Sequence, residues 1–425
     1  MELWDWVILI VALVLLGCLA FWHWLKKRRR EPLGTSYQTK KSASTGKGSS
    51  QKSSSQPQGP QPSDSFTLGM DPDIASSQPD RGDIRTLQPT VDEPDAKNHA
   101  VVQVHFATDR HWQPSDAPES QFGGQRGELR YGTCSVSIPR DHRMGALEKP
   151  SIWRLEFRKN PDKHVVLLDL SLSDQAGFFQ SVKAKVSGSK KQTAFLFIHG
   201  YKVSFEDAAR RTAQMSYDLG FDGAPVFYSW PSRGSLAAYT VDEQSMEWST
   251  PNLRDFLREF LLYSGAKQIY LIAHSMGNRG LTRALTDLFS ENPAYANRIQ
   301  EIILTAPDID AEVFKRDIAP VIARQGRPMT LYSSSEDLAL VASRKVHGHP
   351  RAGDAGDHLL IVPGVETIDA TGLDTSFIGH SYYAETRSVL SDLFYLIHEG
   401  HRADARFGLI PQERSHHGRY WRFKQ

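Results

Sequence analysis

The chain changes from a polar stretch to alternating apolar and polar segments near Ala100. Short runs rich in β-branched and aromatic residues then follow one another, separated by polar loops. Such runs are typical of β-strands. The predicted strands are 101–110, 129–139, 151–157 and 164–170.

The pattern changes again from Gln192, where apolar runs alternate with helix-like segments. The predicted strands are 193–200, 224–232, 269–273, 301–307 and 328–334. The predicted helices are 205–220, 252–265, 279–289, 310–322 and 381–399. Strands that alternate with helices form a mostly parallel sheet with helices on both faces. The earlier strands would extend this sheet as antiparallel strands.

The N-terminal segment has the pattern of a membrane helix. Trp6–Leu25 is a run of about the twenty apolar residues that a helix needs to cross a bilayer, with tryptophan near both ends. Five basic residues, Lys26–Arg30, follow at once, and only acidic charges precede the run. This order favours a retained anchor over a cleaved signal peptide, with the rest of the chain on the cytoplasmic side of a bacterial inner membrane.

A lipoprotein signal is the alternative for the same segment. The residues LLGC that end at Cys18 resemble a lipoprotein cleavage box, in which Cys18 would be lipidated and the domain would lie outside the cytoplasm. The missing basic segment before the apolar run, and the apolar residues after Cys18, argue against it.

Composition divides the chain into three parts. Residues 1–30 are the predicted anchor with its basic flank, 31–98 are a polar linker with too little apolar surface to fold, and 99–425 form the folded domain.

Lys plus Arg number 50 and Asp plus Glu 49, so no overall charge indicates a nucleic-acid partner. The two cysteines, Cys18 and Cys134, predict neither a disulfide framework nor a metal-thiolate site. We expect no metal and no cofactor.

A candidate nucleophile lies between a predicted strand and a predicted helix. In the stretch IYLIAHSMGNRGL, residues 269–281, Ser275 is flanked two positions away by Ala273 and Gly277. A serine in a sharp strand-to-helix turn is a nucleophile elbow, and its strained backbone requires small residues at these two positions. The alternative is an ordinary serine that caps the helix.

A serine nucleophile needs a base, and the base needs an acid that orients it. With a nucleophile elbow, the acid and then the histidine follow later in the chain. Asp337, at the end of the strand 328–334, is the predicted acid, and the neighbouring Glu336 could replace it. Asp308 and Asp310 follow the preceding strand and are a second alternative, although a helix N-cap explains them better.

His380 is the predicted base, because it lies in a late loop just before the last predicted helix. Three other histidines fall in a glycine-rich loop that precedes another apolar run: His347, His349 and His358. The oxyanion of the reaction needs two backbone N–H donors. Met276, after the nucleophile, and Tyr201, after the strand that ends in His199-Gly200, lie at the expected places.

Several motifs together resemble a known family. They are FATDR, YGTCSVSIPRDH, FIHGY, YSWPSRGS, AHSMGN, TAPDID, LYSSSEDLAL and GHSYYAET, spread over residues 101–423. In these motifs the chain resembles a bacterial family of α/β-hydrolases of unknown function, described as esterase- or lipase-like. The resemblance implies the α/β-hydrolase fold and a triad of Ser275, Asp337 and His380, and it supplies no settled substrate.

Two hypotheses of different classes follow. The first is a membrane-tethered serine esterase or lipase-like hydrolase, which acts on a small-molecule or lipid ester through an acyl-enzyme. The second is a non-catalytic interaction module that uses the same fold. The connection 229–249 carries Trp230, Tyr239 and Trp248 among acidic residues, and is either a pocket wall or lid, or a surface loop whose aromatic side chains cover the core.

Overall fold

The computed structural model describes residues 98–150, 156, 158–233, 238–373, 383–415 and 418–424. The predicted membrane helix, all but the last residue of the linker, and His380 lie outside these ranges. Within them, no helix is both long enough and apolar enough to cross a membrane.

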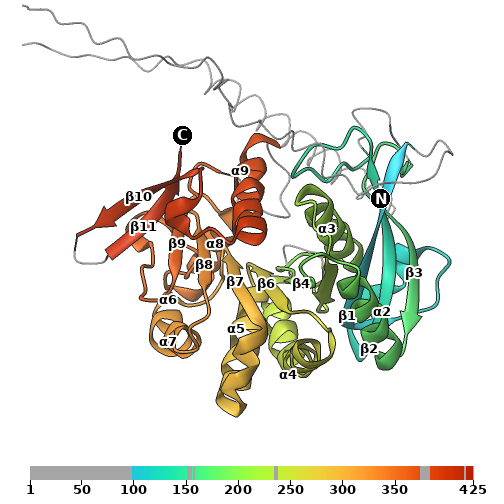
Figure 1. Ribbon diagram of the computed structural model, residues 1–425, viewed down its shortest axis with the longest axis horizontal. Coiled ribbons are helices and arrows are strands. Elements are labelled where there is room, and N and C mark those ends of the chain that lie inside the picture. Colours follow the sequence, from blue (N-terminus) through green and yellow to red (C-terminus); the bar gives the residue numbers. More distant parts are fainter. Residues whose placement is uncertain are drawn as a thin grey trace, which may run out of the picture. The chain divides into compact units, whose positions relative to one another are not determined.

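One sheet of eleven strands organises the described residues, in the order β10-β11-β9-β8-β7-β6-β4-β5-β1-β2-β3 (Figure 1). Strands β1 and β4 to β9 run parallel to their neighbours in the centre, and β2 and β3 extend the sheet as antiparallel strands. The strands are β1 (His99–Trp112), β2 (Phe122–Pro139), β3 (Val166–Ser173), β4 (Thr193–Ile198), β5 (Ala224–Ser229), β6 (Gln268–His274), β7 (Ile299–Thr305), β8 (Met329–Ser333), β9 (Glu366–Asp369), β10 (Leu409–Arg414) and β11 (Gly418–Phe423). The predicted mostly parallel α/β architecture with antiparallel N-terminal strands is therefore confirmed.

Helices cover both faces of the sheet. The α-helices are α2 (Gln175–Ser187), α3 (Phe205–Asp218), α4 (Tyr239–Tyr263), α5 (Gly277–Glu291), α6 (Ala311–Val313), α7 (Ala319–Ala323), α8 (Leu338–His347) and α9 (Tyr383–Phe394). The described residues also contain two π-helical turns, η6 (Phe314–Ile318) and η8 (Tyr395–Glu399), and four 3-10 turns, η2 (Pro118–Ser120), η5 (Pro293–Arg298), η7 (Gly356–His358) and η9 (Ala403–Ala405).

The alternation of side chains along β4 divides the core in two. Leu196 and Ile198 pack with α2, α4 and α5, whereas Phe195 and Phe197 pack with α3 and α9 on the other face. Successive side chains of a strand point to opposite faces, so a strand that is apolar at every position must be covered on both sides. All six residues of β4 are buried, as this arrangement requires.

Some predicted elements differ from the structure. His347 is not in a loop but ends α8, a helix that begins because Asp337 accepts hydrogen bonds from the amides of Ala339 and Leu340. The predicted helix 310–322 is interrupted by the π-turn η6, and the connection 229–249 is helical from Tyr239 onward. Strands β9 to β11 and helix α2 were not predicted, and the predicted strand 151–157 lies almost wholly outside the described residues.

A buried charged histidine joins the loop after β2 to the end of α3. His142 contacts Glu148 through Nδ1 at 2.9 Å and Asp218 through Nε2 at 2.8 Å, and its side chain is only 3% exposed. Burial by itself would lower the pKa of His142, but the hydrogen bonds and charges of Asp218 and Glu148 outweigh this and raise the pKa to about 9. The imidazolium is therefore the folded form at neutral pH.

We predict that His142→Gln lowers the free energy of unfolding in a pH-dependent way. The folded pKa is about 9 and the unfolded pKa about 6.5. The charged His142 therefore contributes its full stabilisation of the folded state below about pH 6.5, and this stabilisation is lost as the pH rises through 9. One pKa unit corresponds to about 1.4 kcal/mol, so the pH-dependent part is on the order of 3 kcal/mol. Denaturant unfolding of the full chain between pH 6 and 10 measures it.

His105→Gln is the matched control. His105 is also buried, but burial lowers its pKa to about 4, so it is neutral in both folded and unfolded chains above pH 7. Its effect on unfolding should stay constant between pH 7 and 10. A His142→Gln effect that is equally flat would contradict the charged-histidine interpretation.

Candidate active site

Ser275 occupies a strained turn between β6 and α5. Its φ is 49°, in the left-handed region that a residue other than glycine seldom adopts. The turn is held on both sides, because the amide of Ser275 donates to Thr305 O at 3.0 Å, and Asn278 donates to Ser275 O through its backbone and its side chain at 3.1 and 2.9 Å. A serine held in a strained strand-to-helix turn has the backbone geometry of a nucleophile elbow.

The small residues around Ser275 are explained by close backbone contacts. A Cβ at Gly277 would lie 2.5 Å from His199 O and 2.7 Å from Ile198 O, so the start of α5 presses directly on the end of β4. A Cβ at Gly200 would lie 2.9 Å from Cβ of Ser275. The loop after β4 therefore rests on the side chain of Ser275.

The two amides predicted to form the oxyanion site follow Ser275 and Gly200 directly in the chain. Met276 follows Ser275 and is buried, and Tyr201 follows Gly200 in the loop after β4. Within the described ranges, no residue accepts a hydrogen bond from either N–H group. Backbone N–H groups without an acceptor in the protein are suited to receive a developing negative charge.

The loop after β4 is itself strained and tightly held. Lys202 has a φ of 60°, and its amide donates to the buried carboxylate of Asp242 on α4 at 3.2 Å. Asp242 also accepts from Ser232 Oγ at 2.6 Å and from the amide of Arg233 at 2.8 Å. A helix from the connection after β5 thus fixes the loop that carries Tyr201.

The predicted acid Asp337 lies in the loop after β8, at the N-terminus of α8. Its Oδ1 accepts from the amides of Ala339 and Leu340 at 2.9 and 3.0 Å. The neighbouring alternative, Glu336, is exposed. Asp337 is also close enough to Tyr201 for its charge to contribute to the raised pKa of that phenol, after the larger effect of burial.

The alternative acid Asp308 is occupied by other partners. Ser343 Oγ and Arg351 Nε contact its Oδ1 at 2.5 and 2.9 Å, and Tyr239 OH and Arg279 contact its Oδ2 at 2.5 and 3.2 Å. Burial would raise the pKa of Asp308, but the two guanidinium groups outweigh this and lower it. Such a carboxylate is the centre of a structural ion network.

Asp310, the other alternative, caps α6, since its Oδ1 accepts from the amides of Glu312 and Val313.

Among the histidines, His347 contacts Glu243 at 2.8 Å through Nε2 and Ser343 O at 2.8 Å through Nδ1. His349 and His358 are exposed. His380, the predicted base, lies outside the described residues.

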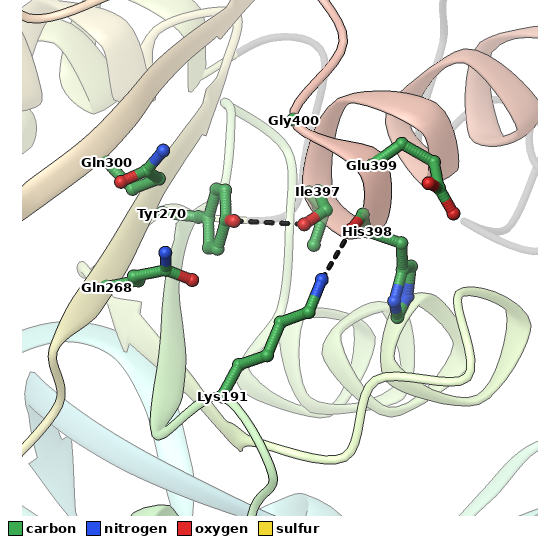
Figure 2. A pocket seen from close by; sticks show the side chains of 8 residues that line it. All are labelled: Lys191, Gln268, Tyr270, Gln300, Ile397, His398, Glu399 and Gly400. Atoms are coloured by element: carbon green, nitrogen blue, oxygen red, sulfur yellow. Dashed lines mark hydrogen bonds between the residues drawn. The ribbon is translucent and has the colours of Figure 1, made fainter.

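Two hollows open on the described surface. One, of about 410 Å³, is lined by Glu243, Arg279, Ile309, Asp310, His347, His349 and Arg351, around the network of Asp308. The other, of about 370 Å³, is shown in Figure 2. There Lys191 Nζ donates to His398 O at 2.5 Å and Tyr270 OH to Ile397 O at 3.0 Å, so these side chains satisfy carbonyls at the end of η8.

That second hollow lies away from the nucleophile. Gln268 begins β6, whereas Ser275 follows the end of the same strand. Over the part of the chain that the structure describes, no cluster of three or more histidine, cysteine or acidic side chains could hold a metal ion. The strained turn at Ser275 remains the candidate site.

The family comparison agrees with this geometry. A family model described as alpha/beta hydrolase of unknown function (DUF900) matches residues 174–398. The chain belongs to this family of α/β-hydrolases. The match covers all five predicted site residues: Tyr201, Ser275, Met276, Asp337 and His380.

Solved structures of hydrolases are also similar to this α/β-hydrolase. A protein described as a predicted CIB-like hydrolase from Thermoplasma acidophilum is 15% identical, with a TM-score of 0.30, over 55% of this chain and 93% of the other. Lipase B of Aspergillus fumigatus is 13% identical, with a TM-score of 0.21, over 35% of this chain and 38% of the other. A search of the curated proteins found no match.

We predict that Gly277→Ala destabilises this hydrolase by about 1–3 kcal/mol, the usual cost of overpacking. The added methyl would meet two backbone carbonyls of β4, which cannot move aside as a flexible side chain can. Denaturant unfolding measures the loss. Gly188→Ala is the control, because its methyl would lie no closer than 3.6 Å to any atom and its φ is −76°. Equal midpoints for the two variants would refute the close contact between α5 and β4.

Proposed function

We propose that this α/β-hydrolase is a membrane-tethered serine hydrolase that cleaves carboxylic esters through an acyl-enzyme. Its triad is Ser275, Asp337 and His380, and its oxyanion donors are the amides of Tyr201 and Met276. The observation that carries the proposal is the strained turn at Ser275, against which the loop after β4 is packed through Gly200. The substrate is a small-molecule or lipid ester.

The proposed mechanism follows from the roles of these groups. His380 removes the proton of the Ser275 hydroxyl as Oγ attacks the ester carbonyl, and the oxygen of the tetrahedral intermediate accepts from the two amides. His380 then gives the proton to the leaving alcohol, and a water molecule that His380 activates hydrolyses the acyl-enzyme. Asp337 orients the imidazole and stabilises its charged form.

Asp337 is the better choice of acid for a reason of electrostatics. Asp308 already compensates the guanidinium groups of Arg279 and Arg351, and its withdrawal would leave the buried Arg351 without its carboxylate. Oδ1 of Asp337 accepts from two amides at the N-terminus of α8, and these hydrogen bonds hold the carboxylate in one orientation.

We predict that a fluorophosphonate probe labels the full-length wild type and does not label Ser275→Ala. Ser275→Ala and His380→Ala should each abolish turnover of a short-chain p-nitrophenyl ester, and Asp337→Asn should lower kcat by up to roughly 10⁴-fold. Asp310→Asn is the control, since this residue only caps α6. Unfolding midpoints show whether each variant is folded.

Two outcomes would overturn parts of this proposal. Full activity of Asp337→Asn together with loss of activity in Glu336→Gln would transfer the role of the acid to Glu336. A folded wild type that neither reacts with the probe nor turns over esters would favour the non-catalytic interaction module.

The membrane anchor is proposed from the sequence pattern of Trp6–Leu25 and the bases that follow it. Lys and Arg beside a span resist translocation, and anionic lipids attract each base by roughly 1 kcal/mol near the surface. The domain would then lie on the cytoplasmic side, tethered by the polar linker.

We predict that a reporter active only in the cytoplasm is active when it is fused to the C-terminus of the full chain in a bacterial host. A reporter active only after export should be inactive at the same place. Moving Lys26–Arg30 in front of the apolar run should exchange the two results. Activity of the exported reporter in the natural sequence would refute the orientation, and acyl labelling lost in Cys18→Ala would establish the lipoprotein alternative.

A further inference from the structure

A buried arginine lies behind the loop that carries Tyr201. Arg110, at the end of β1, is 1% exposed and donates hydrogen bonds to three segments far apart in the sequence. Its acceptors are Gly123 O, Ser229 Oγ, Ser232 O and Val203 O, at 2.7 to 3.0 Å. Burial lowers the pKa of Arg110 to about 10, so the group remains a cation, and a donor only, at neutral pH.

Ser229 links Arg110 to His199 through contacts of its hydroxyl group. Its Oγ accepts from Arg110 Nε at 2.8 Å and lies 3.1 Å from Nε2 of His199. Because the guanidinium cannot accept, the hydroxyl hydrogen of Ser229 is available for Nε2. Arg110 itself lies 3.4 Å from Nε2, again as a donor. Nε2 of His199 is therefore an acceptor.

The contact of the other ring nitrogen of His199, Nδ1, independently indicates the same tautomer. Nδ1 lies 2.8 Å from Gly200 O, which can only accept, so Nδ1 carries the hydrogen. Burial, followed by the charge of Arg110, holds the pKa of His199 well below its usual range, so the ring is neutral. The ring stacks on Trp230, whose Nε1 donates to His199 O at 2.8 Å, and it cannot turn freely.

Gly200 O belongs to the same peptide group as the amide of Tyr201. In a trans peptide group the C=O and N–H point in opposite directions. A bond that holds Gly200 O toward the imidazole therefore turns the N–H of Tyr201 away from it. Gly200 lies against Cβ of Ser275, so this peptide group is next to the proposed nucleophile.

We propose that Arg110, Ser229 and His199 form a hydrogen-bond relay that sets the orientation of the 200–201 peptide and so presents the amide of Tyr201 to the oxyanion. His199 is a positioning residue in this account, since it acts through the peptide and contacts neither the ester nor Ser275 Oγ. The inference rests on the proposed serine-hydrolase function.

Two substitutions of His199 separate this role from packing. The amide nitrogen of His199→Asn stands at the same distance along the side chain as Nδ1 and can donate to Gly200 O, whereas His199→Gln reaches the place of Nε2 and cannot. Glutamine is nearer to histidine in volume. A packing role therefore predicts that Gln is the milder change, and the relay predicts that Asn is.

The experiment measures kcat and KM for p-nitrophenyl butyrate, and Ki for a trifluoromethyl ketone, whose adduct with serine carries an oxyanion, on the full-length chain. Losing one oxyanion donor costs roughly 10²–10³-fold in kcat. We expect His199→Gln to lose about 10²-fold in kcat and in ketone affinity, with KM unchanged. We expect the kcat and ketone affinity of His199→Asn to stay within about tenfold of wild type. His105→Asn and His105→Gln, at a buried histidine that also contacts a serine, should change neither constant.

Ser229→Ala keeps the proposal testable if the histidine variants do not fold. It removes one hydroxyl, and should lower kcat roughly five- to tenfold with KM unchanged, while Ser137→Ala, at an equally buried serine in β2, should not. Milder loss in His199→Gln than in His199→Asn, or wild-type kcat in Ser229→Ala, would overturn the relay. An inactive wild type that is also unreactive toward fluorophosphonate would instead refute the proposed function on which the relay rests.

Discussion

The contact between the turn after β6 and the loop after β4 is the constraint on which the candidate site depends. Gly277 brings α5 against the carbonyls of β4, and Gly200 brings the neighbouring loop against Ser275. A Cβ at either position would overlap atoms of the facing segment, so the two segments would have to move apart. The close approach of Ser275 and the loop that carries Tyr201 therefore depends on both glycines.

Hydrogen bonds from the surrounding structure hold the strained backbone at this contact in place. Ser275 and Lys202 both have positive φ, and residues in such conformations persist where their neighbours over-determine them. Thr305 and Asn278 hold the first, and Asp242 holds the second. The residues that hold the turn and the loop come from three elements, β7, α5 and α4, so the site depends on a strand of the sheet and on two of the helices that cover it.

Local patterns predicted the parallel sheet and the turn at Ser275, because the central strands are mostly apolar runs and the turn needs small residues at fixed distances. They did not predict α8, whose start depends on the capping side chain of Asp337, or the role of Arg110, whose acceptors lie up to 122 positions away in the chain. The motif FATDR did contain a signal, since a charged residue that ends an apolar strand needs buried partners. Its partners, however, are brought together only by the pairing of β1 with β5. The order of the strands alone favours Asp337 over Asp308, whereas the ion partners of Asp308 lie on other elements and could not be predicted from the sequence.

The most direct test of the account is to trap the acyl-enzyme. The full-length wild type is mixed with p-nitrophenyl butyrate, quenched in acid within one turnover, digested and analysed by mass spectrometry. The account predicts a butyryl group on the peptide that contains Ser275, formed at the rate of the first release of nitrophenol and lost as turnover ends. Ester hydrolysis with no acyl group on Ser275, or with the acyl group on another residue, would contradict it.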